Sequence, residues 1–109
     1  MKISTTLAFF FCIGLAASAQ AQDKVAAGQK VFTDQKCGVC HSVGDKGNKK
    51  GPLDSVASKL SEADLRAWIT DAKGMTAKTK ATRKPDMKAY ALPKEEVDGL
   101  VAYLQTLKK

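Results

Sequence analysis

Residues 37 to 41 read Cys37-Gly38-Val39-Cys40-His41, and this stretch governs the interpretation of the whole chain. Two thiols at this spacing can form a redox-active disulfide, but that motif needs alternating strands and helices around it, and the chain shows no strand pattern. A structural disulfide across so short a loop would stabilise little, because the entropy that it removes falls with loop length. A zinc site needs about four nitrogen or sulfur ligands. The chain has one histidine, and its third cysteine, Cys12, lies in an N-terminal apolar run.

The same five residues match the signature for covalent attachment of a c-type haem. The two intervening residues allow both sulfurs to bond to vinyl groups on neighbouring pyrroles, and the histidine that follows is placed beneath the iron. The sequence therefore predicts one haem c, bound covalently through Cys37 and Cys40, with His41 as an axial iron ligand.

The first 21 residues have the pattern of an export signal. Met1-Lys2 gives a positive start, Leu7 to Ala17 is almost wholly apolar, and Ala19-Gln20-Ala21 supplies the small residues that signal peptidase requires. The apolar run is too short to span a bilayer. We expect cleavage after Ala21, a periplasmic location and a mature domain over residues 22–109; an uncleaved signal anchor is the alternative.

A mature chain of about 88 residues is small enough for a cofactor to be needed to complete its core. The whole chain carries 18 basic and 11 acidic side chains, for a formal net charge of +7. Loss of Lys2 with the leader reduces this charge to +6, and two haem propionates would bring it to roughly +4. The mature protein is therefore expected to be basic.

Three segments of the mature chain show helical patterning, and the expected fold class is all-α. The first segment is 23–36, with Asp23 as its N-cap. The second begins at Ser61, which forms a capping box with Asp64, and runs to about Ala72, with Gly74 ending it. The third begins at Pro93, carries acidic residues in its first turn and ends with two lysines. Its apolar face consists of Val97, Leu100, Val101, Leu104 and Leu107.

Two loops separate these segments. Residues 43–51 are rich in glycine and lysine and predict an exposed connection. Residues 73–92 have no periodicity, and so long a loop requires a buried anchor, which a haem face would supply.

Over essentially its whole mature length the chain resembles the class I monohaem cytochromes c. The resemblance implies three main helices wrapped around one covalently bound haem. It also implies that the first and last helices cross, with Gly28 and Phe32 on one side and Leu100 and Tyr103 on the other. Glycine lets two backbones approach closely, and the larger side chains fill the contact.

The resemblance further assigns roles to three residues around the haem. The carbonyl of Pro52 would accept a hydrogen bond from His41 and so leave the other ring nitrogen for iron. Trp68 and Tyr90 would reach the haem propionates with their polar groups, the alternative for both being plain packing.

The sixth iron ligand is expected to be a methionine, because a neutral thioether favours ferrous iron and raises the reduction potential. Met75 and Met87 remain after cleavage of the leader. Met87 precedes the last helix and stands three residues before Tyr90, as the ligand does in the family that the chain resembles, so Met87 is preferred. The family commonly has proline directly after this methionine, whereas Lys88 stands here.

The predicted function is that of a monomeric periplasmic electron carrier between respiratory donor and acceptor proteins, and not an enzyme, because the single histidine is committed to iron. The alternatives are a haem subunit of a periplasmic oxidoreductase complex and a sensing haem with an open sixth position. No nucleic-acid partner is expected. The long loop carries a cluster of basic residues that is expected to border the haem edge and to favour partners with acidic docking faces. These residues are Lys73, Lys78, Lys80, Arg83, Lys84 and Lys88. The alternative is a solvated loop whose charges serve solubility.

Overall fold

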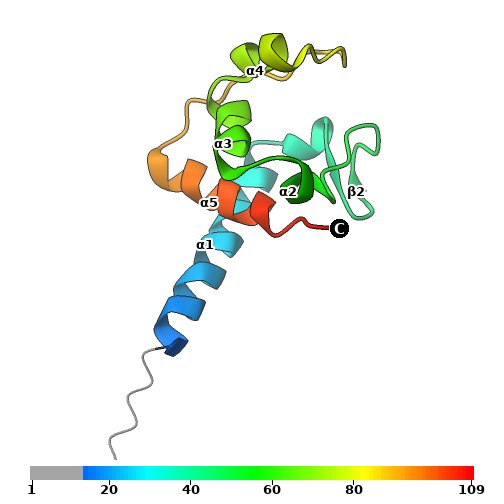
Figure 1. Cartoon of the computed structure of the whole chain (residues 1–109). Helices are drawn as coiled ribbons and strands as arrows, with labels where there is room; N and C mark the ends of the chain where they lie inside the picture. The colour runs from blue at the N-terminus through cyan, green and yellow to red at the C-terminus, as the bar shows by residue number, and fades with distance from the viewer. Residues whose placement is uncertain (1–13) are drawn as a thin grey trace, which may run out of the picture.

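The structure is a computed structural model that describes the backbone of residues 14–109 and the side chains from residue 19 onward. The described residues are mainly helical, so the predicted all-α class is confirmed (Figure 1). The α-helices are α1 (Gly14–Asp34), α2 (Val56–Lys59), α3 (Glu62–Thr70), α4 (Ala72–Thr79) and α5 (Lys94–Gln105). A short 3-10 helix, η1 (Cys37–Val39), and two strands, β1 (Ser42–Val43) and β2 (Lys46–Gly47), lie between α1 and α2.

The centre of the fold is the crossing of α1 and α5, which the resemblance implied. Gly28 of α1 lies directly against the backbone of Gly99 in α5, since a Cβ on Gly28 would overlap the Gly99 carbonyl. Four residues further along each helix, the rings of Phe32 and Tyr103 meet edge to face with centroids 5.7 Å apart. The close approach needs a glycine at position 28, whereas a Cβ on Gly99 would meet its nearest atom at 3.2 Å. Gly99 is the partner that the sequence did not single out.

α5 supplies most of the core, in agreement with its predicted apolar face. Pro93 directly precedes the helix, and the acidic residues that follow lie in its first turn. Leu107 falls after the last residue of α5 but still packs, half-buried, against the core. The buried core residues are Val31, Leu65, Ile69, Val97, Leu100, Val101, Tyr103 and Leu104.

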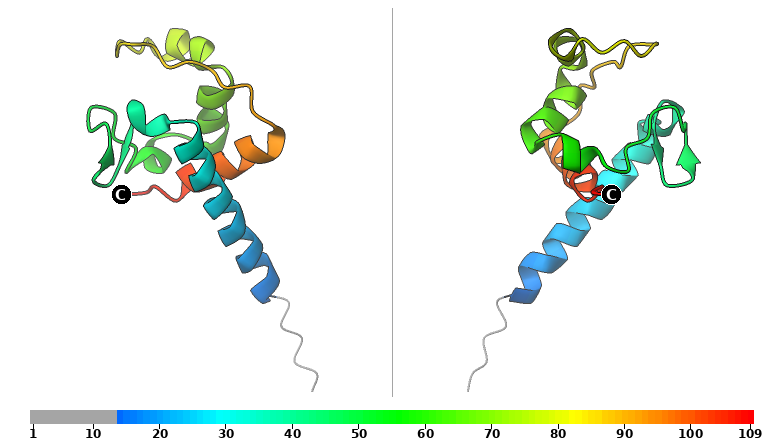
Figure 2. Two further views of the ribbon diagram at one scale, coloured as in Figure 1. Left: turned by 180° about the vertical axis from the view of Figure 1, so that it is seen from behind. Right: turned by 45° about the vertical axis from the view of Figure 1, so that its right-hand side comes forward.

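α1 is longer than the sequence predicted. The helix begins at Gly14, so Asp23 lies inside it and is not an N-cap in the full-length chain. Its last residue is Asp34, two residues before the predicted end. The first half of α1 projects from the rest of the body in each view (Figure 2), and residues 19–27 are exposed except for Val25. The expected cleavage site after Ala21 lies in this projecting half; residues 1–13 of the expected leader lie outside the described part of the chain.

The start of α3 agrees with the predicted capping box, because the Ser61 hydroxyl accepts a hydrogen bond from the backbone N–H of Asp64 at 3.1 Å. The predicted stop at Gly74 is wrong. α3 ends at Thr70, and the carboxylate of Asp71 accepts from the N–H of Gly74 at 3.2 Å, which starts a further helix, α4. A capping aspartate thus outweighs the glycine that follows it.

The segment predicted as an exposed connection, 43–51, includes a small antiparallel hairpin that pairs Ser42 with Gly47 and Val43 with Lys46. Gly44 and Gly47 have φ angles of 58° and 95°, which glycine adopts without strain. Ser42 is 2% exposed and also bridges to Pro52. The hairpin thereby fixes the position of the chain directly after His41.

Among the helices of residues 14–109, none is both long enough and apolar enough to cross a membrane.

Candidate functional site

The site begins where α1 ends. Lys36 adopts a left-handed conformation with φ of 56°, which turns the chain out of α1 and into η1. The backbone N–H groups of Cys40 and His41 both donate to the carbonyl of Cys37, at 3.2 and 2.9 Å. This tight turn places both thiols and the imidazole in the lining of one cavity.

Cys37 and Cys40 are free thiols, and both are half-buried. Burial raises the pKa of the Cys37 thiol, since the uncharged form is favoured where water is excluded. In the structure the two thiols are not joined in a disulfide, and both sulfurs are free for covalent attachment to a bound group.

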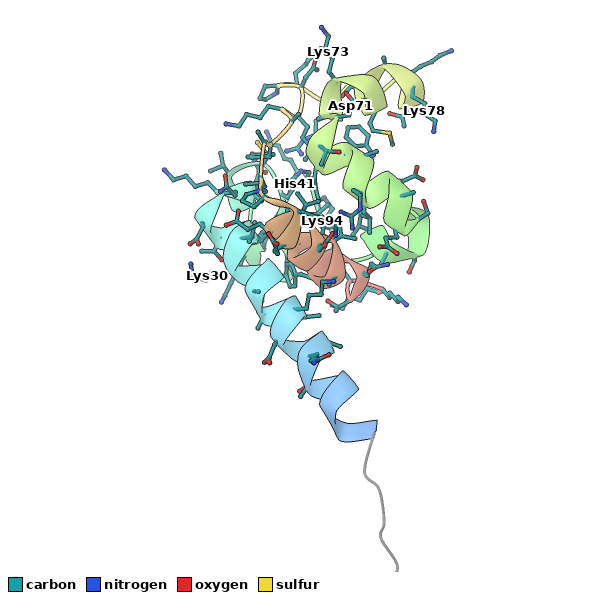
Figure 3. The ribbon with its side chains drawn as sticks, turned by 90° about the vertical axis from the view of Figure 1, so that its left-hand side faces the viewer. Lys30, His41, Asp71, Lys73, Lys78 and Lys94 are labelled. Atoms are coloured by element: carbon teal, nitrogen blue, oxygen red, sulfur yellow. The ribbon has the colours of Figure 1, made fainter. Side chains whose placement is uncertain are left out.

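His41 lies toward the middle of the body (Figure 3). Its Nδ1 lies 3.1 Å from the carbonyl oxygen of Gly51, and a donated hydrogen bond there fixes the ring and leaves Nε2 free. Burial lowers the pKa of the imidazole, and the Arg83 guanidinium lowers it as well, while the bond to Gly51 opposes them. The neutral ring that results is the form that binds a metal ion.

The assignment of the His41 partner to Pro52 is wrong by one residue. In the parallel bridge next to the hairpin, the N–H of Ser42 donates to Gly51 O and the N–H of Leu53 donates to Ser42 O. Successive carbonyls of an extended segment point in opposite directions. The Gly51 carbonyl therefore faces His41 and Ser42, and the Pro52 carbonyl faces away; Pro52 does not line the cavity.

The cavity has a volume of about 490 Å³, and its walls are mainly apolar. Helices α1, α2, α3 and α5 supply Phe32, Val56, Leu65, Ile69, Leu100 and Leu104 to these walls. Met87 lines the cavity from the segment between α4 and α5, together with Cys37, Cys40 and His41. Met75 is 6% exposed within α4 and does not line it. The two methionines that the sequence left open are thus in different surroundings.

Trp68 and Tyr90 both line the cavity, and a contact of their polar groups with haem propionates stays a prediction. The N–H of Tyr90 donates to the carbonyl of Ile69 at 2.8 Å, which ties the end of the long loop to α3. Burial raises the pKa of the Tyr90 hydroxyl, and the Lys88 ammonium lies 5.4 Å from the centre of its ring. Among the described residues, neither the Trp68 indole N–H nor the Tyr90 hydroxyl has a hydrogen-bond partner.

Arg83 is a residue of the site that the sequence did not single out. It appeared there only as one of six basic residues in a loop. In the structure its guanidinium lines the cavity and donates to the carbonyl of Cys40 at 2.6 Å. No local pattern joins residues 43 positions apart, so this contact depends on the fold.

These observations together fit a haem. The lining combines mainly apolar side chains with two free thiols, a histidine with one free ring nitrogen, and a thioether. A Cβ on Gly51 would overlap the carbonyl of Cys40, so glycine is required where the histidine partner approaches the attachment segment.

Comparison with known proteins agrees with this site. The family model for cytochrome c matches residues 25–108, and the chain belongs to the cytochrome c family. No curated protein and no solved structure matches the chain. Family membership makes the chain an electron-transfer haem protein with covalently bound haem c, and the two cysteines that such binding needs are Cys37 and Cys40.

When bound, the haem supplies a metal that gains and loses one electron. Cys37 and Cys40 would anchor the haem, His41 is oriented by its hydrogen bond to Gly51, and the apolar wall would keep water from the iron. A rigid, dry surrounding of this kind lets the metal change charge with little rearrangement.

Proposed function

We propose that this protein is an exported electron carrier with a single haem c, bound through Cys37 and Cys40 and ligated by His41 Nε2 and the thioether sulfur of Met87. The observation that carries the proposal is the shared cavity, whose lining includes both thiols, the free side of the imidazole and Met87. Histidine and methionine ligation suits an electron carrier, because it leaves no open position for substrate and favours the ferrous state.

Met87 is the proposed sixth ligand because its half-buried side chain reaches the cavity from the loop between α4 and α5. Met75 is buried against its own surroundings in α4 and fills space there, a common use of methionine. The absence of proline after Met87 does not prevent this placement.

The test compares Met87→Ala with Met75→Ala in the haem-bearing protein. Loss of Met87 is expected to abolish the far-red charge-transfer absorption of thioether-ligated ferric iron and to allow carbon monoxide to bind the ferrous form. Loss of Met75 is expected to leave both properties unchanged and to lower stability by about 2–5 kcal/mol, the usual cost of truncating a buried methionine. The reverse pattern would make Met75 the ligand.

The proposal places the protein in the periplasm, as expected from the leader sequence, where it acts as a monomer between redox proteins and not as an enzyme. The supporting features are the leader pattern, the exposed basic residues of the segment around the cavity and the absence of a second histidine from the sequence. Lys73 and Lys78 extend away from α4 into solvent (Figure 3). A basic face of this kind would attract partners with acidic docking faces.

A further inference from the structure

The segment between α4 and α5 is held to the rest of the protein at few points. At its start the N–H of Ala81 donates to Thr76 in α4, and near its end the N–H of Tyr90 donates to Ile69. Residues 82–89 lie between these points, and two hydrogen bonds of the described chain involve them. The Lys84 ammonium donates to Asp86, which is a local contact, and the Arg83 guanidinium donates to the carbonyl of Cys40. Arg83 is therefore the one hydrogen-bonded link from this part of the loop to another part of the fold.

The residues that Arg83 contacts are those that hold the haem attachment segment in place. Its guanidinium donates to the carbonyl of Cys40 at 2.6 Å and packs against Gly51, where a Cβ would overlap it. Gly51 in turn accepts from His41. One guanidinium thus contacts both the residue before His41 and the residue that orients its ring.

We propose that Arg83 is a positioning residue that fastens the Met87-bearing loop to the segment Cys37 to His41, so that the two axial ligands stay at a fixed separation. The inference rests on the proposed function, since it assumes that Met87 is a ligand. The charge of Arg83 has a second effect. A cation close to the iron disfavours the ferric state, which carries one more positive charge, and therefore holds the reduction potential up.

The link is specific in chemistry as well as in place. A guanidinium offers several N–H donors in a fixed plane and stays charged at all physiological pH values, so it can donate to a carbonyl and pack against a backbone at once. A charged donor also makes a stronger hydrogen bond than a neutral one. Glutamine is polar but shorter than arginine and uncharged, so Arg83→Gln removes both the contact and the charge.

Lys84→Gln is the matched control. It removes the same charge from the next residue of the same loop, but the Lys84 ammonium pairs with Asp86 at 2.7 Å and its side chain is 75% exposed. Among the described residues, Lys84 has no hydrogen bond to the attachment segment Cys37 to His41. The two variants therefore differ in the contact with Cys40 and not in net charge.

The experiment measures two properties of the haem-bearing proteins: the affinity of the ferric form for added imidazole, and the midpoint potential. Arg83→Gln is expected to raise imidazole affinity about tenfold, as loss of one charge-assisted hydrogen bond would allow. It is also expected to shift the ratio of oxidised to reduced protein several-fold toward the oxidised form, where tenfold corresponds to about 59 mV. For Lys84→Gln, both the imidazole affinity and the ratio of oxidised to reduced protein are expected to stay within about twofold of the parent.

Arg83→Lys is the second variant, and it replaces Arg83→Gln in both measurements if Arg83→Gln does not yield a haem-bearing protein. Because it keeps the charge, it should lie closer to the parent in potential than in imidazole affinity. The inference is overturned if Arg83→Gln, or Arg83→Lys in its absence, matches the parent in imidazole affinity, or if Lys84→Gln changes as much. A parent chain that carries no haem would instead contradict the proposed function itself.

Discussion

Gly51 combines two roles at the scale of one residue. Its carbonyl orients His41, and its lack of a side chain leaves room for the Cys40 carbonyl and the Arg83 guanidinium. Any Cβ here would have to displace backbone, which cannot relax as a flexible side chain can. Position 51 therefore has no space for a side chain in this structure.

Gly51→Ala is accordingly expected to lower the free energy of unfolding of the haem-bearing protein by about 1–3 kcal/mol, the usual cost of overpacking. Chemical denaturation measures the change. Gly38→Ala, in the same region, is the control, because the nearest atom to an added Cβ there is 3.8 Å away. Equal stability of the two variants would show that Gly51 is not closely packed.

The residues of the site differ in how far the sequence could place them. Cys37, Cys40 and His41 follow from a local motif, and all three line the cavity. Gly51 was missed by one position, because the direction in which a carbonyl points depends on the bridge between Ser42 and Pro52. Arg83 was missed entirely, since its contact with Cys40 has no local signal.

At the scale of elements, the crossing of α1 and α5 sets how closely the helices that flank the cavity approach. Gly28→Ala would place a Cβ onto the Gly99 carbonyl, whereas Gly99→Ala would meet its nearest atom at 3.2 Å. Both positions lie inside helices, so the gain in helix propensity is the same. Thermal or chemical denaturation should therefore show a larger loss of stability for Gly28→Ala. The opposite order would contradict the crossing geometry.

A second contact between elements depends on pH. The Asp98 carboxylate on α5 accepts hydrogen bonds from Lys94 and from Arg66 of α3, and these lower the pKa of Asp98 below its ordinary 3.8. A group whose pKa is lowered by folding stabilises the native state above the ordinary value. That contribution is lost as the pH falls through the lowered pKa.

Asp98→Asn is therefore expected to have a lower Tm than the parent at neutral pH, with the difference in Tm narrowing once the pH falls below the ordinary carboxyl pKa of 3.8. Glu95→Gln, on the exposed first turn of α5, is the control and should show little difference at either pH. A difference for Asp98→Asn that is constant across this range would show that the ion pairs contribute nothing.

Helices with a clear apolar period were predictable, and α4 was not. The pattern of α5 and the capping box of α3 both correspond to the structure. α4 has only two buried residues, Ala72 and Met75, and contains a glycine, so neither periodicity nor propensity marks it. It forms because Asp71 caps it and because those two side chains become buried, and both are effects of the folded chain.

At the scale of the whole molecule, the dominant long-range property is the positive net charge, formally +7 for the full sequence and lower for the mature protein. If docking on acidic partners is electrostatic, the rate of electron transfer to such a partner should fall steeply as salt rises to about 0.15 M, where charges are screened beyond roughly 8 Å. Reduction by a small neutral reagent should stay constant over the same range. If the rate of electron transfer to the acidic partner also stayed constant as salt rises, the basic residues would serve solubility alone.

The central claim is that two thioether bonds and one imidazole hold a single haem in the cavity. The most direct measurement is the mass and visible spectrum of the protein produced together with haem-maturation machinery and exported. We expect a coloured, low-spin protein whose mass equals that of residues 22–109 plus one haem. A colourless protein with the mass of the bare chain would contradict it.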